Sequence, residues 1–113
     1  MRWIVPLLLA GCAAGPGERW AGPVTPETPS AACQPSRGVL TAREGKALFA
    51  PNEATIVLDG TLAPDGALRA ERTTAGAYKK PFRHVLEARL DGDRVTGTLS
   101  TPRCRHRVEL TRQ

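Results

Sequence analysis

Aromatic side chains are scarce in this chain of 113 residues, which has two Trp, one Tyr and two Phe. Their scarcity argues against a large ligand pocket, because such pockets are lined mainly by apolar and aromatic side chains. The sequence also lacks a Gly-rich phosphate loop, a Gly-x-Ser-x-Gly elbow, a His-Glu-x-x-His pattern and a Cys-x-x-Cys pair. We therefore predict no enzymatic activity, no cofactor and no metal.

A long hydrophobic run is also missing, since a membrane-spanning helix needs about 20 apolar residues. The N-terminus instead has one positive charge at Arg2, a short uncharged stretch over residues 3–10, and small residues up to Gly11. These are the three parts of a secretory signal. We interpret residues 1–11 as an export signal that is cleaved.

The signal ends in Leu9-Ala10-Gly11-Cys12, which resembles the lipobox of bacterial lipoproteins. The resemblance implies a diacylglyceryl group on Cys12, cleavage after Gly11 and a membrane anchor. In many Gram-negative bacteria an aspartate after the lipidated cysteine retains the protein in the inner membrane. This chain has Ala13 there, so the resemblance implies an outer-membrane, periplasm-facing location. The alternative is an ordinary secretory signal followed by a chance cysteine.

Residues 12–32 carry four prolines and three glycines, and Trp20 is their one large aromatic side chain. This composition predicts a semi-extended linker of up to roughly 60 Å. The folded domain is then expected at residues 33–113. It contains Cys33 and Cys104, which in an oxidising compartment are predicted to form a disulfide. Free thiols or a shared metal site are the alternatives.

The domain reads as strands separated by turns, among them Pro64-Asp65-Gly66 and Asp91-Gly92-Asp93. The predicted fold is all-β: a small antiparallel meander curled into a barrel or sandwich. Residues 41–49 are also compatible with a short helix. Strands are expected at 55–63, 67–73, 82–90, 94–100 and 104–111, with two further candidates at 38–41 and 46–50.

The last three predicted strands alternate between an apolar and a basic face. Because arginine binds phosphate and carboxylate groups bidentately, the basic face is a candidate site for an anionic partner. A solvated face with Glu87 and Glu109 as cross-strand partners is the alternative. The arginines of the candidate face are Arg83, Arg89, Arg94, Arg103, Arg105 and Arg107.

Two further groups of residues are candidates for function. Tyr78, Lys79 and Lys80 lie in a predicted loop, where the tyrosine either anchors a partner or closes one end of the core. His84 and His106 fall on the apolar face and could join Cys104 in a metal site. We interpret them instead as core residues, because a disulfide would occupy the cysteine.

The net charge of +5 favours an anionic partner in the cell envelope, such as a lipid, an acidic glycan or an acidic protein. Nucleic acid is not expected in that compartment. The function predicted is that of an accessory lipoprotein of the outer membrane that binds such a partner. Two alternatives are an inhibitor of a lytic enzyme, like the lipoprotein lysozyme inhibitors, and a carrier of a small apolar ligand.

Overall fold

The computed structural model describes residues 18–52 and 56–113. The predicted export signal, the predicted lipobox with Cys12, Ala13 and the first part of the predicted linker lie outside these residues. Within the described residues, no helix is long and apolar enough to cross a membrane.

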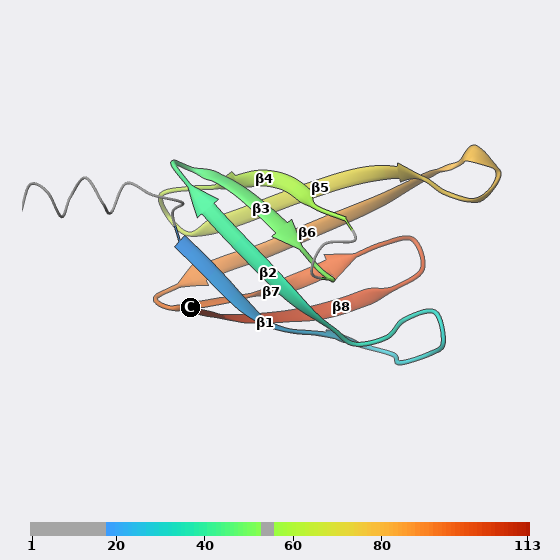
Figure 1. Ribbon diagram of the computed structural model, residues 1–113, viewed down its shortest axis with the longest axis horizontal. Coiled ribbons are helices and arrows are strands. Elements are labelled where there is room, and N and C mark those ends of the chain that lie inside the picture. The colour runs from blue at the N-terminus through green and yellow to red at the C-terminus, as the bar shows by residue number, and fades with distance from the viewer. Residues whose placement is uncertain (1–17, 53–55) are drawn as a thin grey trace, which may run out of the picture.

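Eight antiparallel strands form a closed barrel in which each strand pairs with the next and β8 pairs with β1 (Figure 1). The all-β prediction and the barrel alternative within it are thereby confirmed. A single turn of 3-10 helix, η1, spans Ala77–Lys79. The strands are β1 (Glu18–Pro26), β2 (Ser36–Arg43), β3 (Lys46–Ala50), β4 (Leu58–Leu62), β5 (Ala67–Ala75), β6 (Pro81–Asp91), β7 (Arg94–Ser100) and β8 (Arg105–Arg112).

Strand β1 contradicts the prediction that residues 12–32 are a linker and that the domain begins at residue 33. Seven residues of β1 pair with β2, and its other edge pairs with β8, so β1 closes the barrel. Trp20 is 1% exposed and belongs to the core. Because proline and glycine are depleted in strands, their abundance here favours a linker. Every second residue of β1 nevertheless points inward, namely Trp20, Gly22, Val24 and Pro26.

Side chains fill the interior of the barrel. An eight-stranded barrel is just wide enough for its inward side chains to meet at the axis. The core is built around Trp20 and Phe49, which are surrounded by aliphatic residues from the other strands. The largest fully buried side chains are Trp20, Phe49, Leu40, Leu58, Leu86, Leu110, Val24, Val95 and Val108.

The two ends of the barrel differ. One end, the hairpin end, carries the tight turns at 44–45, 63–66 and 92–93 together with Glu18 and Gln113. The other, the loop end, carries the longer connections at 27–35, 76–80 and 101–104. The β5–β6 hairpin projects beyond the barrel at the loop end (Figure 1). The part of the molecule with the least regular and most protruding backbone is therefore remote from the start of β1.

The helix considered for residues 41–49 is not formed. Strands β2 and β3 run through this segment, joined by Glu44 and Gly45, whose φ angles of 52° and 82° make a tight hairpin turn. The residues that point into the core are Leu40 and Ala42 on β2 and Ala47 and Phe49 on β3. The pairing of these two strands therefore outweighs the local helical tendency.

The predicted disulfide between Cys33 and Cys104 is present, with 5.7 Å between the two Cα atoms. It joins the β1–β2 connection to the β7–β8 connection at the loop end. These two segments are separated by 71 residues of sequence. The bond therefore holds together loops whose strands are already neighbours through the β1–β8 pairing.

Gly97 lies where β7 comes unusually close to β6. A Cβ atom at this position would lie 2.3 Å from the Glu87 carbonyl oxygen and 2.4 Å from the Cβ atom of Ala88. Replacing Gly97 by valine is expected to lower the free energy of unfolding by about 2–3 kcal/mol, because the two strands must separate. Chemical denaturation measures this, with Thr96→Val on the exposed face as the control, expected within about 0.5 kcal/mol of the parent. Equal values for the two variants would contradict the close approach.

Candidate functional site

The six arginines of the predicted basic face do not form one patch. Arg94 pairs with Thr111 beside the turn at 92–93, whereas Arg103 lies in the 101–104 loop at the other end of the barrel. Arg107 pairs with Thr98 between them. Residues of one strand that are six positions apart, such as Arg83 and Arg89, are separated by roughly 20 Å. The six arginines are therefore spread along the length of the barrel.

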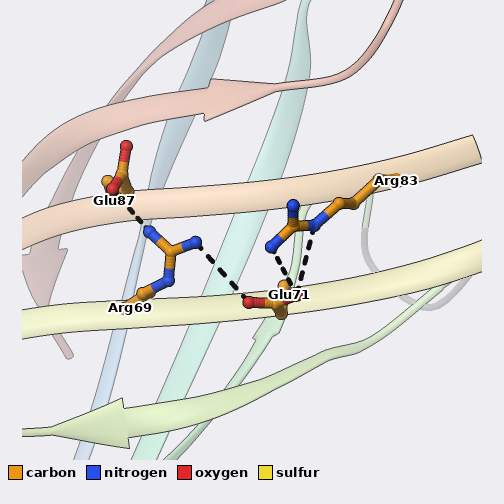
Figure 2. A network of polar contacts seen from close by, with 4 residues as sticks. All are labelled: Arg69, Glu71, Arg83 and Glu87. Carbon is orange, nitrogen blue, oxygen red and sulfur yellow. Dashed lines mark hydrogen bonds and ion pairs between the residues drawn. The ribbon is translucent and has the colours of Figure 1, made fainter.

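An alternating ladder of charges occupies the outer face of β5 and β6 (Figure 2). Arg83 contacts Glu71 through Nη2 at 2.9 Å and through Nε at 3.2 Å. Arg69 bridges the other side of Glu71 to Glu87. Because these pairs are exposed, each contributes only about 0–1 kcal/mol to stability. Their main effect is to neutralise Arg83, while Glu87 pairs with Arg69 rather than with an arginine of the predicted face.

Two more arginines of the predicted face have partners. The Nε atom of Arg105, on β8, lies 3.8 Å from the Oε2 atom of Glu27, which belongs to the β1–β2 connection. Arg89 donates a hydrogen bond of 3.0 Å to the Asp65 carbonyl oxygen in the β4–β5 turn. Among residues 18–52 and 56–113, Arg94, Arg103 and Arg107 form no ion pair. Only Arg103 of these three is at the loop end.

Lys79, Lys80 and Arg103 form a group that we name the basic tip. All three are exposed, and they come from η1, the β5–β6 connection and the 101–104 loop. None of them has an acidic partner in the described part of the chain. Lys80 and Arg103 line one groove together, so the two loops are neighbours in space. The basic tip is thus a group of uncompensated positive charges at the loop end.

The backbone at the tip of the hairpin holds Tyr78 and Lys79 in the left-handed region, with φ angles of 58° and 62°. This conformation costs a residue with a side chain roughly 1–2 kcal/mol, and strain of this kind gathers at functional sites. Tyr78 is 94% exposed. It therefore does not close the core, and of the two roles predicted for it only partner contact fits its position.

A groove of about 310 Å³ lies between the hairpin and the 101–104 loop. Lys80 and Arg103 supply its charged groups. The remaining lining is mostly apolar and comes from Pro81, Phe82 and Pro102, with the backbone of Gly76 at one side. Sequence reasoning did not single out Phe82 or Pro102 as functional, because the groove arises from two segments about 20 residues apart in the chain.

The two histidines point to the inner side as predicted, and each has a partner in the fold. His106 is buried, and its Nε2 atom lies 3.2 Å from the Gln34 carbonyl oxygen. His84 lies 3.4 Å from Thr74 Oγ1, with its ring 5.1 Å from that of Phe82. Burial lowers the pKa of His84 below its ordinary value, so it is neutral near pH 7. Within the described residues, no group of three metal-ligating side chains is found.

Comparison with known proteins adds no relative: no family model, no curated protein and no solved structure matches this chain. The class of protein is therefore defined by the fold and the site alone. It is a small disulfide-bonded β-barrel with a filled interior and a projecting basic hairpin.

Proposed function

We propose that this protein is a lipid-anchored binding protein of the bacterial outer membrane that docks an anionic partner through the basic tip. One observation carries the proposal: in the part of the chain that the structure describes, Lys79, Lys80 and Arg103 have no acidic partner, and the exposed Tyr78 lies beside Lys79. Cations that lack internal partners attract anionic groups and speed their encounter with the site. An exposed aromatic side chain supplies contact area to a partner.

The short spacer between the lipid and the barrel supports a partner in the aqueous space. If Cys12 carries the lipid, only residues 13–17 separate it from the start of β1 at Glu18. Such a segment spans about 20 Å at most, which is far less than the tether expected from a linker ending at residue 32. Glu18 lies at the hairpin end, opposite the projecting β5–β6 hairpin (Figure 1). A lipid on Cys12 would therefore leave the basic tip facing away from the bilayer.

The structure supports the two alternatives unequally. A carrier of an apolar ligand needs an internal cavity, whereas Trp20, Phe49 and seven leucine and valine side chains are fully buried in the barrel interior. An inhibitor acts through a loop, and the projecting hairpin with Tyr78 is such a loop. Inhibition of a lytic enzyme therefore stays a second candidate, with its interacting surface at the same end of the molecule.

The test is an envelope pull-down with the lipidated protein, followed by mass spectrometry of proteins and lipids. Changing Lys79, Lys80 and Arg103 to glutamate is expected to reduce recovery of the partner at least tenfold, because attraction becomes repulsion. Added salt should weaken recovery by the parent protein. The matched control changes Arg19, Lys46 and Arg94 to glutamate, which alters the net charge equally at the hairpin end, and it should change recovery less than twofold.

Three outcomes would count against the proposal. Equal losses in both triple variants would show that net charge, not the basic tip, governs binding. A stoichiometric lipid recovered without any protein would favour the carrier. A lytic enzyme that is recovered and inhibited, with inhibition lost in Tyr78→Ala but kept in the triple glutamate variant, would favour the inhibitor.

A further inference from the structure

The groove beside the basic tip joins two kinds of surface within a small volume. Lys80 and Arg103 bring positive charge, while Pro81, Phe82 and Pro102 bring an apolar lining. Arginine pairs with carboxylates through two parallel hydrogen bonds, and this pair is stronger where water is partly excluded. A ligand that satisfies the whole groove must therefore carry a negative group next to an apolar one.

The apolar lining is held in place by its surroundings. The Phe82 ring lies against His84, which is neutral near pH 7 because burial lowers its pKa. On the other side, a Cβ atom at Gly76 would lie 3.3 Å from the Cβ atom of Phe82, so glycine permits the close contact between the two hairpin arms. The aromatic surface is thus preformed, and binding does not have to order it.

The size of the groove indicates a macromolecular partner. A volume of about 310 Å³ is at the lower limit for ligand pockets and holds one side chain with its adjacent carboxylate. Tyr78 and Lys79 lie outside the groove on the projecting tip, where only a larger partner can reach them as well. A flat lipid surface cannot enter a recess between two loops.

We propose that this groove binds an acidic polypeptide segment, with an apolar side chain of the segment against Phe82 and a neighbouring carboxylate on Arg103 and Lys80. The inference rests on the proposed function and narrows its partner from any anionic component to a protein. Tyr78 and Lys79 contact the same segment beyond the groove.

Fluorescence anisotropy with the purified full-length protein tests the inference. The probes are a labelled peptide of glutamates around one central leucine, the same peptide with serine in place of leucine, and vesicles of phosphatidylglycerol in phosphatidylcholine. We expect the leucine peptide to bind at least fivefold more tightly than the serine peptide, because leucine buries apolar surface against Phe82. Arg103→Gln should weaken the leucine peptide about tenfold, and Arg94→Gln, at the hairpin end, should change its affinity less than twofold.

Phe82→Ser tests the apolar contact separately. It should remove the preference for leucine over serine, and this ratio does not depend on how much of the variant is folded. Equal binding of the two peptides by the parent, with loss in Arg103→Gln, would overturn the groove while leaving the basic tip as an anion site. Binding of vesicles but of neither peptide would overturn the polypeptide partner, as would the absence of binding to all three probes. In the last case the pull-down with the triple variants decides separately whether the proposed function also fails.

Discussion

Replacing Trp20 by alanine is expected to lower the free energy of unfolding by about 3–5 kcal/mol, as large-to-small changes of buried aromatics do. Trp20 is 1% exposed, pairs with Leu40 on β2 and Arg112 on β8, and lies in the core of the barrel. A natural domain is stable by only about 5–15 kcal/mol. The loss therefore removes a large part of the stability, and urea denaturation followed by circular dichroism measures it.

Trp20→Phe is the matched control for this change. The Nε1 atom of Trp20 is buried and has no hydrogen-bond partner among the described residues. Phenylalanine keeps most of the apolar surface and has no such polar group, so the cost should remain below about 1.5 kcal/mol. An unchanged stability for Trp20→Ala would indicate that residues 18–26 are a tether, and it would contradict the place of strand β1 in the barrel.

The same residue offers an independent optical measurement. The chain has two tryptophans, and removal of residues 1–11 takes Trp3 away. In a protein prepared without residues 1–11, the tryptophan fluorescence then comes from Trp20 alone. A buried ring emits at shorter wavelength than a solvated one, so the folded protein should emit to the blue of the denatured protein, whereas a linker tryptophan would show no such difference.

Loss of the disulfide is expected to cost about 4 kcal/mol, because the cross-link closes a long loop of the unfolded chain. The two cysteines are 71 positions apart. Changing both Cys33 and Cys104 to alanine should lower the Tm by about 15–30 °C, at 4–8 °C for each kcal/mol in a domain of this size. Calorimetry of the parent and the variant measures the shift.

Reductant provides the control for the disulfide. Dithiothreitol should lower the Tm of the parent toward that of the double alanine variant and leave the variant unchanged. An equal Tm for parent and variant without reductant would contradict a stabilising cross-link in this position. The β1–β8 pairing would then be sufficient by itself to hold the two loops together.

The strands that the sequence predicted best have regular alternation and clear turns. The predicted bounds 46–50 and 94–100 are those of β3 and β7, and the Asp91-Gly92-Asp93 turn joins β6 to β7. In both cases local features suffice: period-two burial defines the strand, and positive φ at glycine defines the turn. The disulfide followed in the same way, because Cys33 has one possible partner in the domain.

The site was predicted only in part. Tyr78, Lys79 and Lys80 were recognised as a loop, and Arg103 as a basic residue, yet they were assigned to separate surfaces. Side-chain alternation can place an arginine on the outer face of a strand. It does not show which carboxylate of a neighbouring strand or loop lies beside that arginine. Glu71 neutralises Arg83 and Glu27 neutralises Arg105 through such contacts.

By itself, the amino-acid sequence determined the all-β class, the strands with regular alternation, the turns and the pairing of the two domain cysteines, because each depends on neighbouring residues or on elimination. Only the tertiary structure decided that β1 closes the barrel, that Trp20 is core, and that Lys80, Phe82 and Arg103 share a groove. These facts depend on contacts between segments far apart in the chain, where long-range pairing outweighs the local preference of proline-rich or polar stretches.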